Sequence, residues 1–151
     1  MIEGKADKRG RLLLQIILAS HSQMAKGLKQ TVELIMGKQS NLHAIAAYDD
    51  EQESLKKQIV DQITSNSNEK YLFLTDIIGG SVNTTIAQMI DDKENMFLVT
   101  GMNLPLVLTV LTAKMDNCSS DQVANKLEEF CEEARKELKV VRVAAQEAED
   151  F

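Results

Sequence analysis

The sequence predicts a doubly wound α/β fold, in which a mostly parallel four-stranded sheet carries helices on both faces. Short apolar segments of strand length alternate along the chain with longer segments whose apolar residues recur every three or four positions. Helical connections of this kind are typical of right-handed crossovers between parallel strands. The first apolar segment, residues 12–19, has too few polar positions for a half-exposed strand, which indicates burial on both faces.

The four strands are expected at residues 12–19, 42–47, 71–75 and 96–100. Each of these segments is short and apolar, and polar or glycine-containing turns bound them. A fifth, β-branched segment at residues 140–143 is a candidate edge strand near the C-terminus.

The first two helices follow from the helical spacing of apolar residues and from their end signals. Residues 23–36 form the first helix, and Gly37 ends it at the C′ position. Asp49 or Asp50 is the expected N-cap of the second helix. The apolar side of this second helix consists of Leu55, Ile59, Val60 and Ile63.

Three more helices are expected towards the C-terminus. Residues 82–90 form a helix for which Ser81 is the expected N-cap. Another begins beyond Asn103, with Pro105 in its first turn, where the missing N–H costs nothing. The longest is capped by Ser119 or Ser120. Its apolar stripe consists of Val123, Leu127, Phe130, Ala134 and Leu138.

A chain of 151 residues, 44% hydrophobic and 26% charged, is large enough for one globular domain with its own core. We assign this domain to residues 11–143. The charged residues 1–10 are expected to be an extension outside the fold, compatible with the remnant of an expression tag. Residues 144–151 are expected to form a frayed tail.

Composition and motifs argue against several classes of protein. No apolar segment approaches the roughly 18 to 20 residues that span a bilayer, and the N-terminus lacks the apolar middle of a signal peptide. The net charge of −6 argues against a nucleic-acid surface. Cys118 and Cys131 lack the spacing of a zinc site, so we expect reduced thiols, no metal and a cytoplasmic protein. The P-loop, dinucleotide and serine-hydrolase motifs are missing, so no nucleotide or other organic cofactor is expected.

Chemically capable residues follow the first and third predicted strands. His21 comes one serine after the first strand, and Asp76 comes directly after the third. Gly79, Gly80 and Ser81 then lead into a helix. Because the carboxyl ends of parallel strands meet at one edge of a sheet, we expect these residues to lie together.

This combination predicts a site that holds a phosphoryl group on nitrogen. A carboxylate that accepts the N–H of an imidazole fixes the tautomer, keeps the other nitrogen nucleophilic and stabilises the charge that grows on the ring. A glycine turn at a helix start directs backbone N–H groups towards an anion. His43, at the start of the second strand, lies at the opposite edge and is expected to be structural or exposed.

Four motifs occur in the order of a known family. They are Leu-Ala-Ser-His-Ser at residues 18–22, Ala-Lys-Gly-Leu at 25–28, Thr-Asp-Ile-Ile-Gly-Gly-Ser-Val-Asn at 75–83 and Thr-Gly-Met-Asn-Leu-Pro at 100–105. In this combination the chain resembles the mannose-family enzyme IIA (EIIA) of the bacterial phosphoenolpyruvate:sugar phosphotransferase system (PTS). The resemblance covers nearly the whole chain.

The resemblance implies a phosphotransferase that carries a phosphoryl group on histidine in sugar uptake. His21 would receive the group from phosphorylated HPr and pass it to a IIB domain, while Asp76 would hydrogen-bond the histidine. The loop beside the phosphoryl group would consist of Gly79, Gly80 and Ser81. Asn103 matches a further position at the rim of the site.

The resemblance also implies a homodimer, in which a C-terminal strand completes the partner's sheet, and residues 140–143 suit that role. The chain would meet the membrane only through the other transporter components. One departure is Val82, which stands where many members of the family have proline. We expect the partner-docking surface around His21 to include Met24, Ile77, Ile78 and Met102.

Two alternatives remain open at this point. The first is a related phosphocarrier that feeds dihydroxyacetone kinase. The second is a non-catalytic regulatory or ligand-binding module with a flavodoxin-like fold, which would bind a small anion at the Gly-Gly-Ser turn without forming phosphohistidine.

Overall fold

Strands β1 (Gln15–His21), β2 (Leu42–Ala47), β3 (Tyr71–Thr75) and β4 (Met96–Thr100) form one sheet in the order β2-β1-β3-β4. All three strand pairs are parallel, which confirms the predicted α/β class. The computed structural model describes residues 12–49, 53–63 and 68–143. The predicted N-terminal extension and C-terminal tail lie outside these residues.

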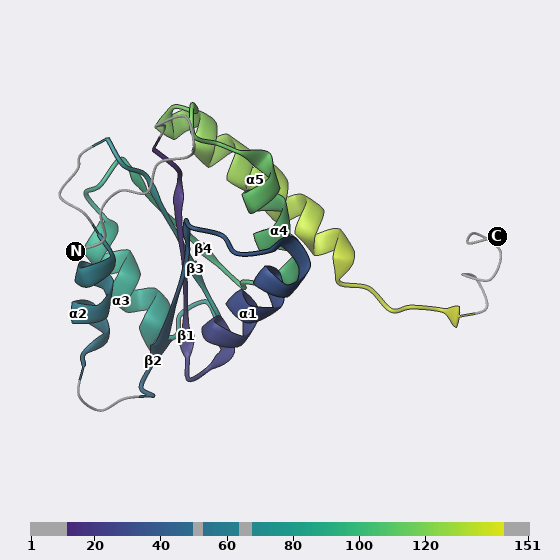
Figure 1. Ribbon diagram of the computed structural model, residues 1–151, viewed down its shortest axis with the longest axis horizontal. Helices are drawn as coiled ribbons and strands as arrows, with labels where there is room; N and C mark the ends of the chain where they lie inside the picture. Colours follow the sequence, from purple (N-terminus) through teal and green to yellow (C-terminus); the bar gives the residue numbers. More distant parts are fainter. Residues whose placement is uncertain (1–11, 50–52, 64–67, 144–151) are drawn as a thin grey trace.

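Helices cover both faces of the sheet (Figure 1). Helices α1 (Met24–Met36), α4 (Leu104–Ala113) and α5 (Ser120–Glu137) lie on one face, and α2 (Leu55–Gln62) and α3 (Ser81–Ile90) lie on the other. Each layer encloses its own cluster of buried apolar side chains. Within the described part of the chain, no helix combines the length and the apolar character needed to cross a membrane.

The central strand β1 explains why its sequence is apolar at consecutive positions. Ile16 and Leu18 point into the cluster beneath α1, α4 and α5, whereas Ile17 and Ala19 point into the cluster beneath α2 and α3. Since successive side chains of a strand face opposite sides, a strand covered on both faces is apolar throughout.

The first strand is shifted relative to its prediction, because its neighbours set its ends. It begins at Gln15, which pairs with Tyr71 of β3, and it continues to His21, which pairs with Ala47 of β2. The prediction at residues 12–19 is therefore wrong at both ends. As a result, His21 is the last residue of the strand and is held in a backbone ladder.

Two predicted N-caps are also wrong. Ser54, not Asp49 or Asp50, caps α2, and its side chain accepts a hydrogen bond from the Lys57 N–H; Asp50 itself lies outside the described residues. Gly80 occupies the N-cap position of α3, so Ser81 is the first helical residue. On α2, Leu55 and Ile59 are buried as expected, but Val60 is exposed.

Residues 138–143 extend away from the body of the domain in Figure 1. Residues 139–142 form neither helix nor strand in the single chain, and Leu138 and Val140 are 91% and 89% exposed. Strand β4 is at the edge of the sheet. The exchange of residues 140–143 between the subunits of a dimer stays a prediction.

The start of α5 provides a test of the helix signals. Ser119 accepts a hydrogen bond from the Gln122 N–H, and Gln122 Oε1 accepts one from the Ser119 N–H, which makes a capping box. Ser119→Ala should lower the free energy of unfolding by about 1 kcal/mol, measured by urea denaturation. Ser120→Ala, one residue along, is the control, and equal losses in the two variants would contradict the assignment of the cap.

Candidate functional site

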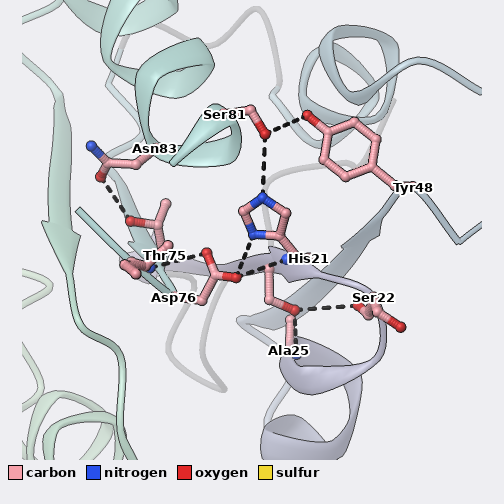
Figure 2. Close-up of polar contacts among 10 residues, drawn as sticks. His21, Ser22, Ala25, Tyr48, Thr75, Asp76, Ser81 and Asn83 are labelled. Carbon is pink, nitrogen blue, oxygen red and sulfur yellow. Dashed lines mark hydrogen bonds and ion pairs between the residues drawn. The ribbon is translucent and has the colours of Figure 1, made fainter. Parts of the chain in front are cut away.

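His21 and Asp76 lie side by side at the carboxyl edge of the sheet (Figure 2). His21 ends β1, and Asp76 follows the last residue of the neighbouring strand β3. The His21 side chain is 43% exposed, whereas that of Asp76 is 12% exposed. The ring is therefore accessible to another molecule while the carboxylate is shielded behind it.

Asp76 holds both the ring and the backbone of His21. Its Oδ2 atom lies 2.7 Å from His21 Nδ1 and accepts a hydrogen bond of 2.9 Å from the His21 backbone N–H. Its Oδ1 atom accepts a hydrogen bond of 3.1 Å from the Ile77 N–H. These contacts fix the carboxylate and, through it, the orientation of the imidazole.

The protonation of the pair follows from this geometry. Burial alone would raise the pKa of Asp76, but the hydrogen bonds from the His21 ring and backbone outweigh burial and lower the pKa below its usual value. An ionised carboxylate only accepts hydrogen bonds, so the proton of the pair lies on Nδ1. In the neutral ring, Nε2 then carries the free lone pair.

Ser81 and Tyr48 lie on the Nε2 side of the ring. Ser81 Oγ is 3.3 Å from Nε2, and the Tyr48 hydroxyl donates a hydrogen bond of 2.8 Å to Ser81 Oγ. The centroids of the His21 and Tyr48 rings are 5.6 Å apart. Tyr48 directly follows β2, and no motif marks it in the sequence, although the rule of carboxyl strand ends applies to β2 as well.

The turn between β3 and α3 needs its glycines. Gly79 has a φ of 73°, in the left-handed region that favours glycine. A Cβ atom on Gly80 would lie 2.9 Å from Ile77 Cγ2 and 3.3 Å from His21 Cε1. Gly80 is the N-cap of α3 and has no side chain that could accept a hydrogen bond. The backbone N–H groups of the first turn of α3 are therefore not capped by a side chain, and they can donate to a bound anion.

Two buried hydroxyls fix the neighbouring backbone. Ser20 Oγ accepts a hydrogen bond of 2.7 Å from the Ala25 N–H and donates one of 3.3 Å to the Ser22 carbonyl, which ties β1 to α1. The Thr75 hydroxyl donates a 2.8 Å hydrogen bond to Asn83 Oδ1, which ties β3 to α3. Both residues lie within the motifs of the sequence, but their anchoring roles depend on contacts that spacing does not show.

The remaining predicted residues have different surroundings. Asn103 is the N-cap of α4, where it accepts a hydrogen bond from the Leu106 N–H and donates one to the Gly101 carbonyl. His43, at the opposite edge of the sheet, lies 2.8 Å from Gln15 Oε1 through Nε2, in agreement with a structural role.

Three of the four predicted docking residues are exposed. Met24, Ile77 and Ile78 present their side chains to solvent around the site. Met102 is buried, and its inclusion in the docking surface was wrong. Its N–H donates to the Thr75 carbonyl, which continues the contact between β3 and β4 and directs the side chain into the core.

Across residues 12–49, 53–63 and 68–143, no group of three or more His, Cys, Asp and Glu residues is placed to hold a metal ion. Cys118 and Cys131 are free thiols and are half-buried. The polar groups of the site are the His21 imidazole, the Asp76 carboxylate, the hydroxyls of Ser81 and Tyr48, and backbone N–H groups.

Comparisons with known proteins agree with the motifs. The family model EIIA-man, described as the PTS system fructose IIA component, matches residues 15–128. The sorbose-specific EIIA component of the PTS of Lacticaseibacillus casei is 30% identical over 139 residues, which cover 91% of this chain and all of that protein.

Two further relatives extend the comparison. The mannose-specific EIIAB component of Escherichia coli K12 is 29% identical over 130 residues, but the chain spans only 40% of its length. The crystal structure of a putative phosphoenolpyruvate-dependent sugar PTS permease from Klebsiella pneumoniae superposes with a TM-score of 0.74 at 29% identity. That superposition covers 90% of this chain and 96% of the Klebsiella chain.

The lowered pKa of Asp76 predicts how its contribution to stability depends on pH. The folded state binds the Asp76 proton less tightly than the unfolded state does, so the stabilisation is complete above the unfolded pKa of about 3.9. It disappears as the pH falls through the lower, folded pKa. The difference in unfolding free energy between wild type and Asp76→Asn should therefore shrink below about pH 4.

Urea denaturation measures this difference in unfolding free energy between wild type and Asp76→Asn. The measurements should run from about pH 2.5 to about pH 7, on both sides of the unfolded aspartate pKa of about 3.9. Asp91→Asn, which changes an exposed aspartate at the far end of α3, is the matched control. A difference for Asp76→Asn that stays constant over the whole range would contradict the expected linkage.

Proposed function

Since the chain belongs to the EIIA-man family of PTS components, we propose that it is a phosphocarrier that accepts a phosphoryl group on His21 Nε2 and passes it on during sugar uptake. One observation carries this proposal. In the neutral ring, the 2.7 Å contact between Asp76 Oδ2 and His21 Nδ1 keeps the proton on Nδ1, which leaves the Nε2 lone pair free to act as a nucleophile.

In the proposed transfer, the lone pair of His21 Nε2 attacks the phosphorus of a phosphorylated donor. The Nε2–P bond forms as the bond between phosphorus and the donor breaks, and the electron pair of the broken bond stays with the donor. The Nδ1 proton does not move, so the ring becomes positively charged. The ionised Asp76 stabilises that charge, and the reverse steps deliver the group to the acceptor.

The start of α3 supplies donors for the phosphoryl oxygens. Phosphoryl transfer depends mainly on positioning and on stabilisation of the equatorial oxygens. The Ser81 hydroxyl lies on the Nε2 side of the ring, and Ser81 is the first residue of α3, whose first-turn N–H groups are further donors. We assign Gly79, Gly80 and Ser81 to this role, and Asn103 to the rim through its position at the start of α4.

We further propose HPr as the donor and a IIB domain as the acceptor, in the cytoplasm. The Escherichia coli relative is named an EIIAB component, which supports an A unit that works with a B unit. Exposed Met24, Ile77 and Ile78 around the ring provide apolar surface for such partners. The relatives are named for sorbose, mannose and fructose, so we assign the chain to sugar uptake without choosing a sugar.

Phosphorylation tests the proposal directly. Incubation with phosphoenolpyruvate, enzyme I and HPr should give an acid-labile phosphoprotein, detected by mass spectrometry and by acid treatment. His21→Ala should abolish the signal, and His43→Ala should retain it because His43 lies at the other edge of the sheet. Full phosphorylation of His21→Ala would overturn the assignment. If wild type binds phosphate without a covalent adduct, the anion-binding alternative is correct.

Gly80 allows a second test that removes no polar group. Gly80→Ala puts a methyl group against His21 Cε1 and Ile77, so the ring must shift. Since small displacements of reacting groups cost up to about 100-fold in rate, we expect phosphorylation by HPr to slow by about tenfold or more. Gly27→Ala on α1, where a Cβ atom meets nothing within 4 Å, is the control. Equal initial rates for the two variants would refute the proposed role of the turn.

A further inference from the structure

We propose that Tyr48 is a positioning residue of this site, which acts through Ser81 to direct a hydroxyl proton towards the phosphoryl group on His21. This inference rests on the proposed phosphorylation of His21. It starts from the chain of contacts Tyr48–Ser81–His21 in Figure 2, in which the two distances are 2.8 Å and 3.3 Å.

The direction of each hydrogen bond follows from the Asp76 contact. In the neutral ring with its proton on Nδ1, His21 Nε2 can only accept, so Ser81 donates its proton to Nε2. Ser81 Oγ accepts in turn from the Tyr48 hydroxyl. The Tyr48 hydroxyl thus uses one lone pair of Ser81 Oγ, and the Ser81 hydroxyl proton is directed towards His21 Nε2.

Contacts of the neighbouring residues fix the backbone of Tyr48, although the residue is 64% exposed. Its φ is 64°, in the left-handed region that a large side chain rarely adopts, and such conformations persist where surrounding contacts impose them. The residues on both sides are tied to the turn between β1 and α1. The Ala47 carbonyl accepts from the Ser22 N–H, and the Asp49 carboxylate accepts from the Gln23 side chain.

Phosphorylation changes what Ser81 can bind. The Nε2 lone pair is used in the bond to phosphorus, so the Ser81 proton must turn to a phosphoryl oxygen. That oxygen is charged, and a hydrogen bond to it is roughly twice as strong as one to a neutral acceptor. Tyr48, by keeping Ser81 oriented as a donor, therefore favours the phosphorylated form.

The equilibrium of phosphoryl exchange with HPr measures this preference. Tyr48→Phe keeps the ring and removes only the hydroxyl. Both Tyr48→Phe and Ser81→Ala should shift the equilibrium towards phosphorylated HPr, by about three- to tenfold, the size expected for one hydrogen bond. Because Tyr48 acts through Ser81, the double variant should show no larger shift than Ser81→Ala alone.

Other outcomes identify which claim fails. If wild type takes no phosphoryl group, the proposed function fails. If wild type is phosphorylated but Tyr48→Phe has the same exchange equilibrium, Tyr48 does not favour the phosphorylated form. If the shift of the double variant equals the sum of the two single shifts, Tyr48 does not act through Ser81. A shift for Tyr48→Leu but none for Tyr48→Phe would assign the effect to the 5.6 Å contact between the rings instead of the hydroxyl.

Discussion

The contact of Asp76 Oδ2 with both the ring and the backbone of His21 is the interaction on which the site depends. A single oxygen atom accepts from the backbone N–H at 2.9 Å and faces Nδ1 at 2.7 Å. Because one bond fixes the end of the strand and the other fixes the ring, the imidazole cannot turn without losing the carboxylate. The tautomer, the free lone pair on Nε2 and the direction of the Ser81 proton all follow from it.

The parallel sheet explains why these groups meet. Three neighbouring strands end at the same edge, and each contributes at its end: β1 supplies His21, β2 is followed by Tyr48, and β3 is followed by Asp76. The parallel register pairs His21 with Ala47, so β1 and β2 end level, and it pairs Thr75 with Ala19, two residues before the end of β1. Residues far apart in the chain thus form one short series of hydrogen bonds.

The parallel α/β sheet and the meeting of His21 with Asp76 could be predicted, because both depend on apolar patterning and on where parallel strands end. Tyr48 could not be found by motif, because its role depends on one contact across space with Ser81. Met102 was misplaced because its backbone bond to Thr75, which turns the side chain inward, is a tertiary contact. The first and last residues of β1 could not be predicted either, because pairing with β2 and β3 determines where the strand begins and ends.

The hydrogen-bond donors at the site suit the proposed function, in which the phosphoryl group must leave again. Within the described part of the chain, no lysine or arginine side chain hydrogen-bonds to His21, Ser81 or Tyr48, whose polar contacts are with Asp76 and with one another. A positive side chain would form stronger, charge-assisted bonds with the phosphoryl oxygens and would stabilise the loaded form more. In the proposed carrier, neutral hydroxyl and backbone donors would orient the phosphoryl group with less stabilisation, and the exposed ring would leave the group open to an acceptor. The proposed reversible carriage of a phosphoryl group on nitrogen would thus use the same geometry that leaves the Nε2 lone pair free.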